Sequence, residues 1–203
     1  MYTVVGSPRT RTMRVLWMLE ELGQPYQIVP AKPHSDAVSA GNPGGKVPVL
    51  HDGDAVITDS VAICTYLADK HGDCTYPAGS PERGHQDAIT QFCVDEIEGA
   101  LWAAAKNTFI NPEEHRAPAI VPVAKFEFAK ALKTLEQHLD GKEFIAGDRF
   151  TVPDLLLTHC AGWARNAKFD IPAGPVADYV TRTRERPALQ RAGARADEAV
   201  AAA

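Results

Sequence analysis

Residues 42–72 read NPGGKVPVLHDGDAVITDSVAICTYLADKHG, and this stretch decides the fold. It begins with two short runs that are typical of strands, Val47 to His51 and Ala55 to Thr58. Between them stands Asp52-Gly53, a residue pair that favours the tight turn of a β-hairpin. The sequence therefore predicts two antiparallel strands at this point.

A helix is expected directly after the hairpin, beginning at Ser60. Ile63, Tyr66 and Leu67 then share one helical face, and Gly72 is suited to end the helix because glycine adopts the left-handed conformation without strain. The predicted unit is strand, strand, helix.

The preceding residues predict a second unit of strand, helix and strand. Tyr2 to Val5 reads as a strand, and Gly6-Ser7-Pro8 breaks it before a helix that reaches about Leu22. Tyr26 to Val29 reads as the next strand, and residues 30–45 as an irregular loop with at most a short helix. The first part of the chain is thus βαβ, loop, ββα, an α/β arrangement.

After residue 80 the sequence predicts only helices. A serine before proline marks a helix start, and Thr151-Val152-Pro153-Asp154 resembles a capping box, in which Asp154 reaches back to the residue before the helix. The expected helices run from Ser80-Pro81 to about Lys106, from about Val123 to Leu139, onward from Thr151, and near residues 175–185 and 187–200. The second part is therefore all-α.

Composition narrows the class of protein. The 203 residues are 45% hydrophobic and 23% charged with a formal net charge of −5, which argues against general binding to nucleic acid or to an anionic membrane surface. No apolar run has the length of a membrane span, and the N-terminus lacks the pattern of a secretory signal. We expect a cytoplasmic protein.

The four cysteines carry no recognisable site. Cys64, Cys74, Cys93 and Cys160 form no CxxC pair and have no zinc-ligand spacing, so neither a metal site nor a dithiol redox site is expected. Three of them read as buried, while Cys74 lies beside an expected loop and is predicted to be the most exposed.

Three stretches in this order resemble the soluble glutathione S-transferase superfamily: SPRTRTMRVLWMLEELG at 7–23, NPGGKVPVL at 42–50 with TDSVAICTYLADKHG at 58–72, and the capping box followed by ERPALQRA at 185–192. The resemblance implies a thioredoxin-like glutathione-binding domain at residues 1–75, a linker at 76–82, and an all-helical domain at 83–203 that holds the second substrate. It also implies a homodimer that uses glutathione as co-substrate and needs no metal.

The resemblance assigns a glutathione-binding role to five residues. A cis bond at Val47-Pro48 would leave the Val47 backbone able to pair with the cysteinyl part of glutathione. Ser60, at a helix N-terminus, is expected to meet the γ-glutamyl carboxylate, Asp59 the amine and Lys46 the glycine carboxylate. The alternative reading of Asp59-Ser60 is a plain helix cap.

A hydroxyl near the first helix is expected to activate the thiol. A cysteine thiol has a pKa of about 8.5, and lowering it by two units takes roughly 2.7 kcal/mol, which one charged hydrogen bond and a helix N-terminus supply together. Ser7 is the first candidate and Thr10 the second. The familiar family spacing before Arg14-Val15 falls on Arg9, so Arg9, Arg11 or backbone N–H groups remain alternatives.

The expected reaction is attack of bound glutathione thiolate on an electrophilic, apolar small molecule, as in detoxification. Trp102, Phe109 and Trp163 are candidates for the second-substrate pocket, although aromatic residues at helical spacing also build cores. Two alternatives stay open: glutathione-dependent reduction of peroxides or disulfides, and a non-catalytic interaction module of the same fold.

Overall fold

The structure is a computed structural model that describes residues 1–202. Its contacts group the chain into two compact units. Met1–Ala78 and residues 185–202 form the first unit, and Gly79–Arg184 forms the second. The predicted fold class, a small α/β unit together with a helical one, is confirmed.

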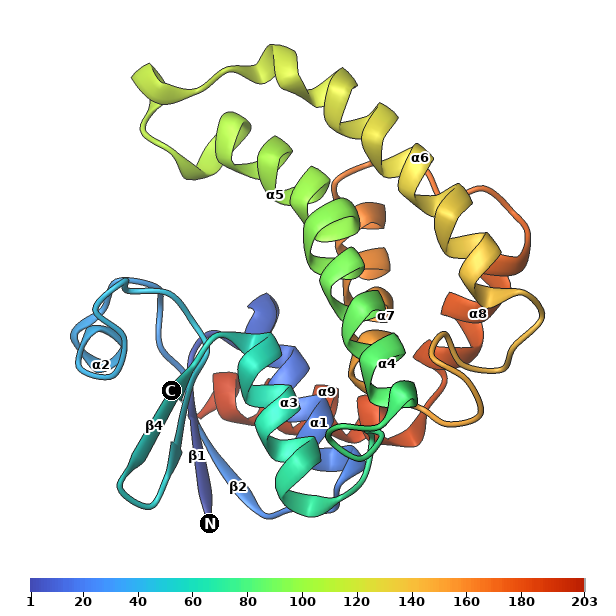
Figure 1. Cartoon of the computed structure of the whole chain (residues 1–203). Helices are drawn as coiled ribbons and strands as arrows, with labels where there is room; N and C mark the ends of the chain where they lie inside the picture. The colour runs from blue at the N-terminus through green and yellow to red at the C-terminus, as the bar shows by residue number, and fades with distance from the viewer. Residues whose placement is uncertain (203) are drawn as a thin grey trace. The chain divides into compact units, whose positions relative to one another are not determined.

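A four-stranded mixed sheet forms the centre of the first unit (Figure 1). In spatial order the strands are β2 (Tyr26–Val29), β1 (Tyr2–Val5), β3 (Val49–Asp52) and β4 (Ala55–Thr58). β1 runs parallel to β2 and antiparallel to β3, and β3 and β4 form the predicted hairpin. β3 begins two residues later than predicted, after Pro48, which has no N–H to donate to a neighbouring strand.

Helices cover both faces of this sheet. α1 (Met13–Glu21) and α3 (Ser60–His71) pack together on one face, and α2 (Asp36–Ser39) lies on the other side (Figure 1). Successive side chains of a strand point to opposite faces, so paired residues of β1 and β3 contribute to two separate cores. Val5 and Val49 pack with Val38 of α2, and Val47 packs against the same cluster.

The last helix, α9 (Pro187–Ala201), packs against α1 within the first unit. By its contacts α9 therefore groups with the first unit, while the domain bounds expected from the sequence include it in the segment 83–203. Three arginines of α9 and its N-cap form ion pairs with two adjacent glutamates of α1: Arg186 with Glu21, and Arg191 and Arg195 with Glu20. These ion pairs, together with the buried alanines Ala188, Ala192 and Ala196 of α9, join α9 to the first unit.

The second unit consists of helices. α4 (Pro81–Phe92) continues through a wider π-type turn at Cys93–Glu98 into α5 (Gly99–Ala105) and ends in a second such turn at Lys106–Ile110. Two short 3-10 turns, Glu113–His115 and Pro118–Ile120, lead to α6 (Val121–Leu139), which packs beside α5 (Figure 1). α7 (Val152–Asn166) and α8 (Pro175–Arg184) complete the unit.

The predicted capping box at the start of α7 is confirmed. The Asp154 carboxylate accepts hydrogen bonds from the Thr151 N–H at 2.8 Å and from the Thr151 hydroxyl at 2.9 Å. It also accepts from the Ile145 N–H at 2.8 Å and the Tyr179 hydroxyl at 2.6 Å. Asp154 therefore joins α7 to the preceding loop and to α8, which a local cap alone would not do.

Cys74 is the most exposed of the four cysteines, as predicted, but at 5% exposure it is still buried. All four cysteines are buried, and none forms a disulfide. Within residues 1–202, no helix combines the length and hydropathy needed to cross a membrane. The described residues also contain no group of three or more histidine, cysteine or acidic side chains placed to hold a metal ion.

Candidate functional site

The turn from β1 to α1 carries the two predicted hydroxyls. Pro8–Thr12 is irregular, with non-helical backbone angles at Arg9 and Thr10, so that α1 begins only at Met13. Ser7 is half-buried, and among the described residues its hydroxyl has no hydrogen-bond partner. The Thr10 hydroxyl instead donates to the Ser7 carbonyl at 2.6 Å. The local geometry thus leaves the Ser7 hydroxyl available to a ligand and holds that of Thr10 within the turn.

The turn contains a third hydroxyl, that of Thr12, which was not predicted as a site residue. Thr12 is fully buried, and its Oγ1 lies 3.1 Å from that of Thr10. A Cβ at Gly6 would come within 2.4 Å of Thr12 Oγ1 and 3.0 Å of Val47 Cβ. Glycine is therefore required at position 6, where the absence of a side chain leaves room for Thr12 and the Val47 side chain.

The predicted Val47-Pro48 segment lies at this same edge. The bond between the two residues is cis. The Val47 side chain is packed in the valine cluster beside β1 and β3, while its N–H and C=O form no hydrogen bond to any residue from 1 to 202. A fixed side chain with unpaired backbone groups can pair with an extended peptide, as an added strand does.

The backbone of Lys46 is held in a turn by a hydrogen bond, whereas its side chain is exposed to solvent. The Asn42 side-chain amide donates to the Lys46 carbonyl at 2.9 Å, and the Gly44 N–H donates to Asn42 Oδ1 at 3.0 Å. Gly45 completes the turn with a φ of +64°, and a Cβ there would overlap His34. Asn42 and Gly45 are supporting residues of this loop, whose Asn-Pro-Gly-Gly turn pattern is visible in the sequence.

Asp59 is the N-cap of α3. Its Oδ1 accepts hydrogen bonds from the Val61 N–H at 2.9 Å and the Ala62 N–H at 3.1 Å, so the capping role that we considered as an alternative is present. The residue is exposed, and its φ of +70° is unusual for any residue other than glycine. The cap occupies one carboxylate oxygen and leaves Oδ2 for a second partner.

Ser60 is 2% exposed, and its hydroxyl accepts a hydrogen bond from Nη1 of Arg14 at 3.2 Å. Arg14 is 1% exposed and lies at the start of α1. It was not predicted as a site residue. An arginine four residues before Met18, on the buried face of α1, is the sequence signal that could have identified it.

Cys64 lies near Ser60 and Arg14, but its thiol is not suited to a role as a nucleophile. Cys64 lies one turn after Ser60, is fully buried, and donates to the Arg14 carbonyl at 3.6 Å. Burial raises the pKa of its thiol to about 12. A thiol with this pKa is a poor nucleophile at neutral pH, which leaves the side chain a packing role.

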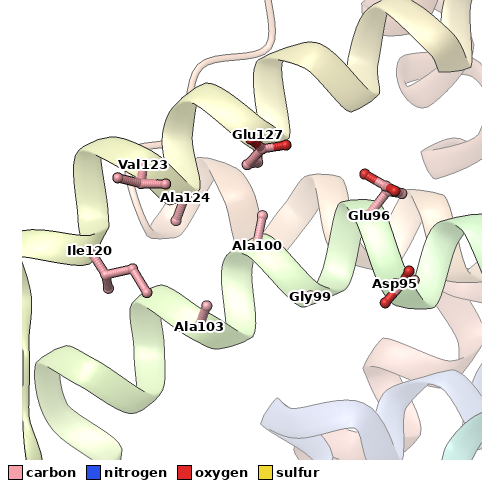
Figure 2. A pocket seen from close by; sticks show the side chains of 9 residues that line it. All are labelled: Asp95, Glu96, Gly99, Ala100, Ala103, Ile120, Val123, Ala124 and Glu127. Atoms are coloured by element: carbon pink, nitrogen blue, oxygen red, sulfur yellow. The ribbon is translucent and has the colours of Figure 1, made fainter.

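The three aromatic candidates of the helical unit are not gathered at one place by the observed contacts. Trp102 and Trp163 meet edge to face, with ring centroids 6.3 Å apart. Phe109 lies in the turn after α5 and is 63% exposed. None of the three lines the pocket between α5 and α6. Its acidic residues Asp95, Glu96 and Glu127 lie toward one end and Ile120 and Val123 at the other, with Gly99 and three alanines also lining it (Figure 2).

Comparison with known proteins agrees with this geometry. Residues 1–79 match the family model described as glutathione S-transferase, N-terminal domain, and residues 122–199 match the one described as glutathione S-transferase, C-terminal domain. Glutathione S-transferase F13 of Arabidopsis thaliana is 30% identical over 154 residues, which cover 70% of each chain.

Two solved structures are similar over nearly the whole chain. The theta class glutathione S-transferase from the citrus canker pathogen Xanthomonas axonopodis pv. citri, with glutathione bound, is 26% identical with a TM-score of 0.76, covering 94% of this chain and 96% of its own. Glutathione transferase URE2P8 from Phanerochaete chrysosporium, with oxidized glutathione, has a TM-score of 0.83 at 20% identity, covering 98% and 96%. The latter likeness concerns the fold.

Proposed function

The chain belongs to the glutathione S-transferase family and is a glutathione transferase, and we propose that its thiolate-bearing co-substrate, glutathione, attacks an electrophilic, apolar small molecule. The observation that carries the proposal is the pair formed by the Ser7 hydroxyl, which has no partner among residues 1–202, and the unpaired Val47 backbone. Gly6, the residue directly before Ser7, approaches the Val47 side chain closely, which supports placing both groups at one site.

Glutathione would bind along this edge as an extended peptide. The Val47 N–H and C=O pair with its cysteinyl backbone, with Pro48 fixing the bend. Ser60 receives the γ-glutamyl carboxylate, Asp59 Oδ2 the γ-glutamyl amine, and Lys46 the glycine carboxylate. The sulfur then lies by the Ser7 turn, where a hydroxyl that donates to thiolate lowers the pKa of the thiol.

Three substitutions test the binding residues. Ser60→Ala and Asp59→Asn should raise the KM for glutathione more than they lower kcat, because these contacts are made both before and during reaction. Lys46→Ala should have the same effect in milder form, since an exposed ion pair contributes under about 1 kcal/mol. Unchanged glutathione affinity by calorimetry in all three variants would show that the site lies elsewhere.

A panel of reactions tests the activity itself. Conjugation of apolar electrophiles should exceed reduction of peroxides and disulfides when both are measured with saturating glutathione. A larger reductase rate would favour the second candidate, in which the same thiolate attacks oxygen or sulfur. The family membership and the unpaired Ser7 hydroxyl favour an enzyme over an interaction module.

The remaining parts of the proposal concern organisation. We propose a glutathione-binding domain at residues 1–75, a linker at 76–82, and a helical domain at 83–203 that uses Trp102, Phe109 and Trp163 for the second substrate. We also propose a cytoplasmic homodimer with a detoxifying role. Light scattering at micromolar concentration should then give twice the chain mass of 21.9 kDa, and a monomer would contradict the dimer.

A further inference from the structure

We propose that Arg14 is a positioning residue for glutathione, which acts by fixing the buried Ser60 hydroxyl as a hydrogen-bond donor to the γ-glutamyl carboxylate. The inference deepens the proposed function and rests on it. It starts from one contact, the 3.2 Å hydrogen bond from Arg14 Nη1 to Ser60 Oγ.

The direction of this hydrogen bond determines what Ser60 can offer. A guanidinium has donors and no acceptor, so the Ser60 oxygen must accept from it. A serine hydroxyl has a single hydrogen, which then points away from Arg14 toward another acceptor. Without Arg14 the same hydroxyl could rotate and present a lone pair, which would repel a carboxylate. The contact therefore favours a hydrogen-bond acceptor next to Ser60, such as a carboxylate oxygen.

The N-terminus of α3 further limits which chemical group can bind beside Ser60. Asp59 already takes the N–H groups of Val61 and Ala62, whereas the Ser60 N–H makes no hydrogen bond to another described residue. Ser60 thus presents two donors from one residue, its N–H and its O–H. Two donors at one point suit the two oxygens of a carboxylate, and the exposed Asp59 oxygen beside them suits an ammonium group.

The burial of Arg14 stabilises this orientation of the Ser60 hydroxyl. Its guanidinium stays protonated at every working pH, and at 1% exposure water competes little for its donors. The Cys64 thiol donates to the Arg14 carbonyl, so the backbone of Arg14 is also joined to α3. Arg14 therefore contacts α3 through both its backbone and its side chain, and the side-chain contact orients the Ser60 hydroxyl.

The test compares glutathione with an analogue that lacks only the γ-glutamyl carboxylate, 4-aminobutanoyl-cysteinylglycine. Calorimetry gives the dissociation constant of the analogue divided by that of glutathione. This ratio measures how strongly the γ-glutamyl carboxylate is recognised. We expect Arg14→Met to reduce this ratio by about 10-fold. The KM for glutathione should rise correspondingly, with kcat per folded enzyme changed less.

A double-mutant cycle separates positioning from direct binding. If Arg14 acts through Ser60, then Arg14→Met added to Ser60→Ala should reduce the ratio by less than about 2-fold further. Arg186→Met is the control for a general loss of stability, because it removes an α1–α9 ion pair, and it should leave the ratio unchanged. An equal loss of the ratio in this control would overturn the inference.

The binding of the two peptides by wild-type protein and by the Arg14 variants distinguishes failure of the binding mode from failure of the Arg14 role. Wild-type protein that binds both peptides equally would refute the carboxylate site and with it the proposed binding mode. Wild-type discrimination that persists in Arg14→Met would refute only the role of Arg14. If Arg14→Met does not fold, Arg14→Lys retains the buried charge without the planar fork, and it should reduce the ratio by about 3-fold; wild-type discrimination in that variant would equally refute the role.

Discussion

Arg186 donates two parallel hydrogen bonds to Glu21, from Nε to Oε1 at 2.6 Å and from Nη2 to Oε2 at 2.8 Å. The Glu21 side chain is 8% exposed and also accepts from Trp17 Nε1 at 2.8 Å. The geometry is bidentate, and such pairs depend on the planar guanidinium. This contact attaches the N-terminus of α9 to the C-terminal end of α1.

Arg186→Lys should therefore destabilise the protein although the charge is retained. A lysine ammonium cannot reproduce two parallel donors, and the loss should be about 1–2 kcal/mol, between the values for exposed and buried pairs. Denaturant unfolding measures it. Lys130→Ala is the matched control, since its pair with Glu127 is open to solvent on both sides and long at 3.6 Å, and it should change stability by less than about 0.5 kcal/mol.

The neighbouring glutamate makes the α1–α9 contact sensitive to pH. Burial acts to raise the pKa of Glu20, but hydrogen bonds from Arg191, Tyr26 and Arg195 outweigh it and hold the pKa below its ordinary value of 4.5. Arg195 also lies over the Tyr26 ring, 3.7 Å from its centroid. A lowered carboxyl pKa contributes stability that is complete above the unfolded pKa and is lost as the pH falls through the folded one.

The thermal midpoint of the wild-type protein should consequently fall as the pH is lowered below about 4.5. Glu20→Gln should melt at a lower temperature than wild type at pH 7 and show a smaller decrease on acidification. Melting curves between pH 7 and pH 3 for both proteins give the comparison. Identical pH slopes would mean that Glu20 does not titrate in this range with a shifted pKa.

Local sequence signals predicted most of the architecture. β1, β2, β4 and α3 have the bounds that periodicity, the Asp52-Gly53 turn and the Gly72 stop indicate. The two glycine signals are strong because Gly53 and Gly72 adopt the left-handed backbone conformation that few other residues tolerate. The predicted contacts of Asp154 were correct because a capping box is defined within four residues.

Features that depend on distant residues were not predictable in this way. α9 contacts α1 through its buried alanines and through arginines that pair with Glu20 and Glu21 about 170 residues earlier, and no local pattern encodes such distant partners. Arg14 was overlooked because its partner Ser60 is 46 residues away. The loop beside Cys74 correctly marks it as the most exposed cysteine, but its burial to 5% exposure depends on packing that a loop assignment does not describe.

The contacts of Asp154 predict a large loss of stability on its removal. Asp154→Ala would leave the Ile145 and Thr151 N–H groups and two hydroxyls without an acceptor in a buried place. We expect a loss of about 3–5 kcal/mol, against about 0.5–2 kcal/mol for Thr151→Ala. Urea unfolding of both variants measures the difference.

Tyr179→Phe is the control for that comparison. It removes one donor and leaves the Asp154 carboxylate with its three remaining hydrogen bonds, so its cost should be about 1–2 kcal/mol. A loss of activity in Asp154→Ala without a change in unfolding would contradict the structural role and indicate a catalytic one.

The two hydroxyls of the β1–α1 turn should differ in their effect on the thiol. The Ser7 hydroxyl has no hydrogen-bond partner among residues 1–202, whereas the Thr10 hydroxyl already donates to the Ser7 carbonyl at 2.6 Å. If Ser7 donates to the thiolate, Ser7→Ala removes a hydrogen bond that stabilises only the charged form, and the pKa of bound glutathione should rise by about one unit or more. Thr10→Ala should loosen the turn and raise this pKa by less.

Ultraviolet titration of the bound thiolate measures this pKa directly in wild type and both variants. Because the other contacts lie elsewhere on the tripeptide, glutathione affinity should change little in Ser7→Ala, and its rate deficit near neutral pH should shrink at alkaline pH, where the thiol ionises without help. A full shift in Thr10→Ala instead would exchange the two assignments. An unmoved titration in both variants would refute hydroxyl activation and leave Arg9, Arg11 or backbone N–H groups as the donors to sulfur.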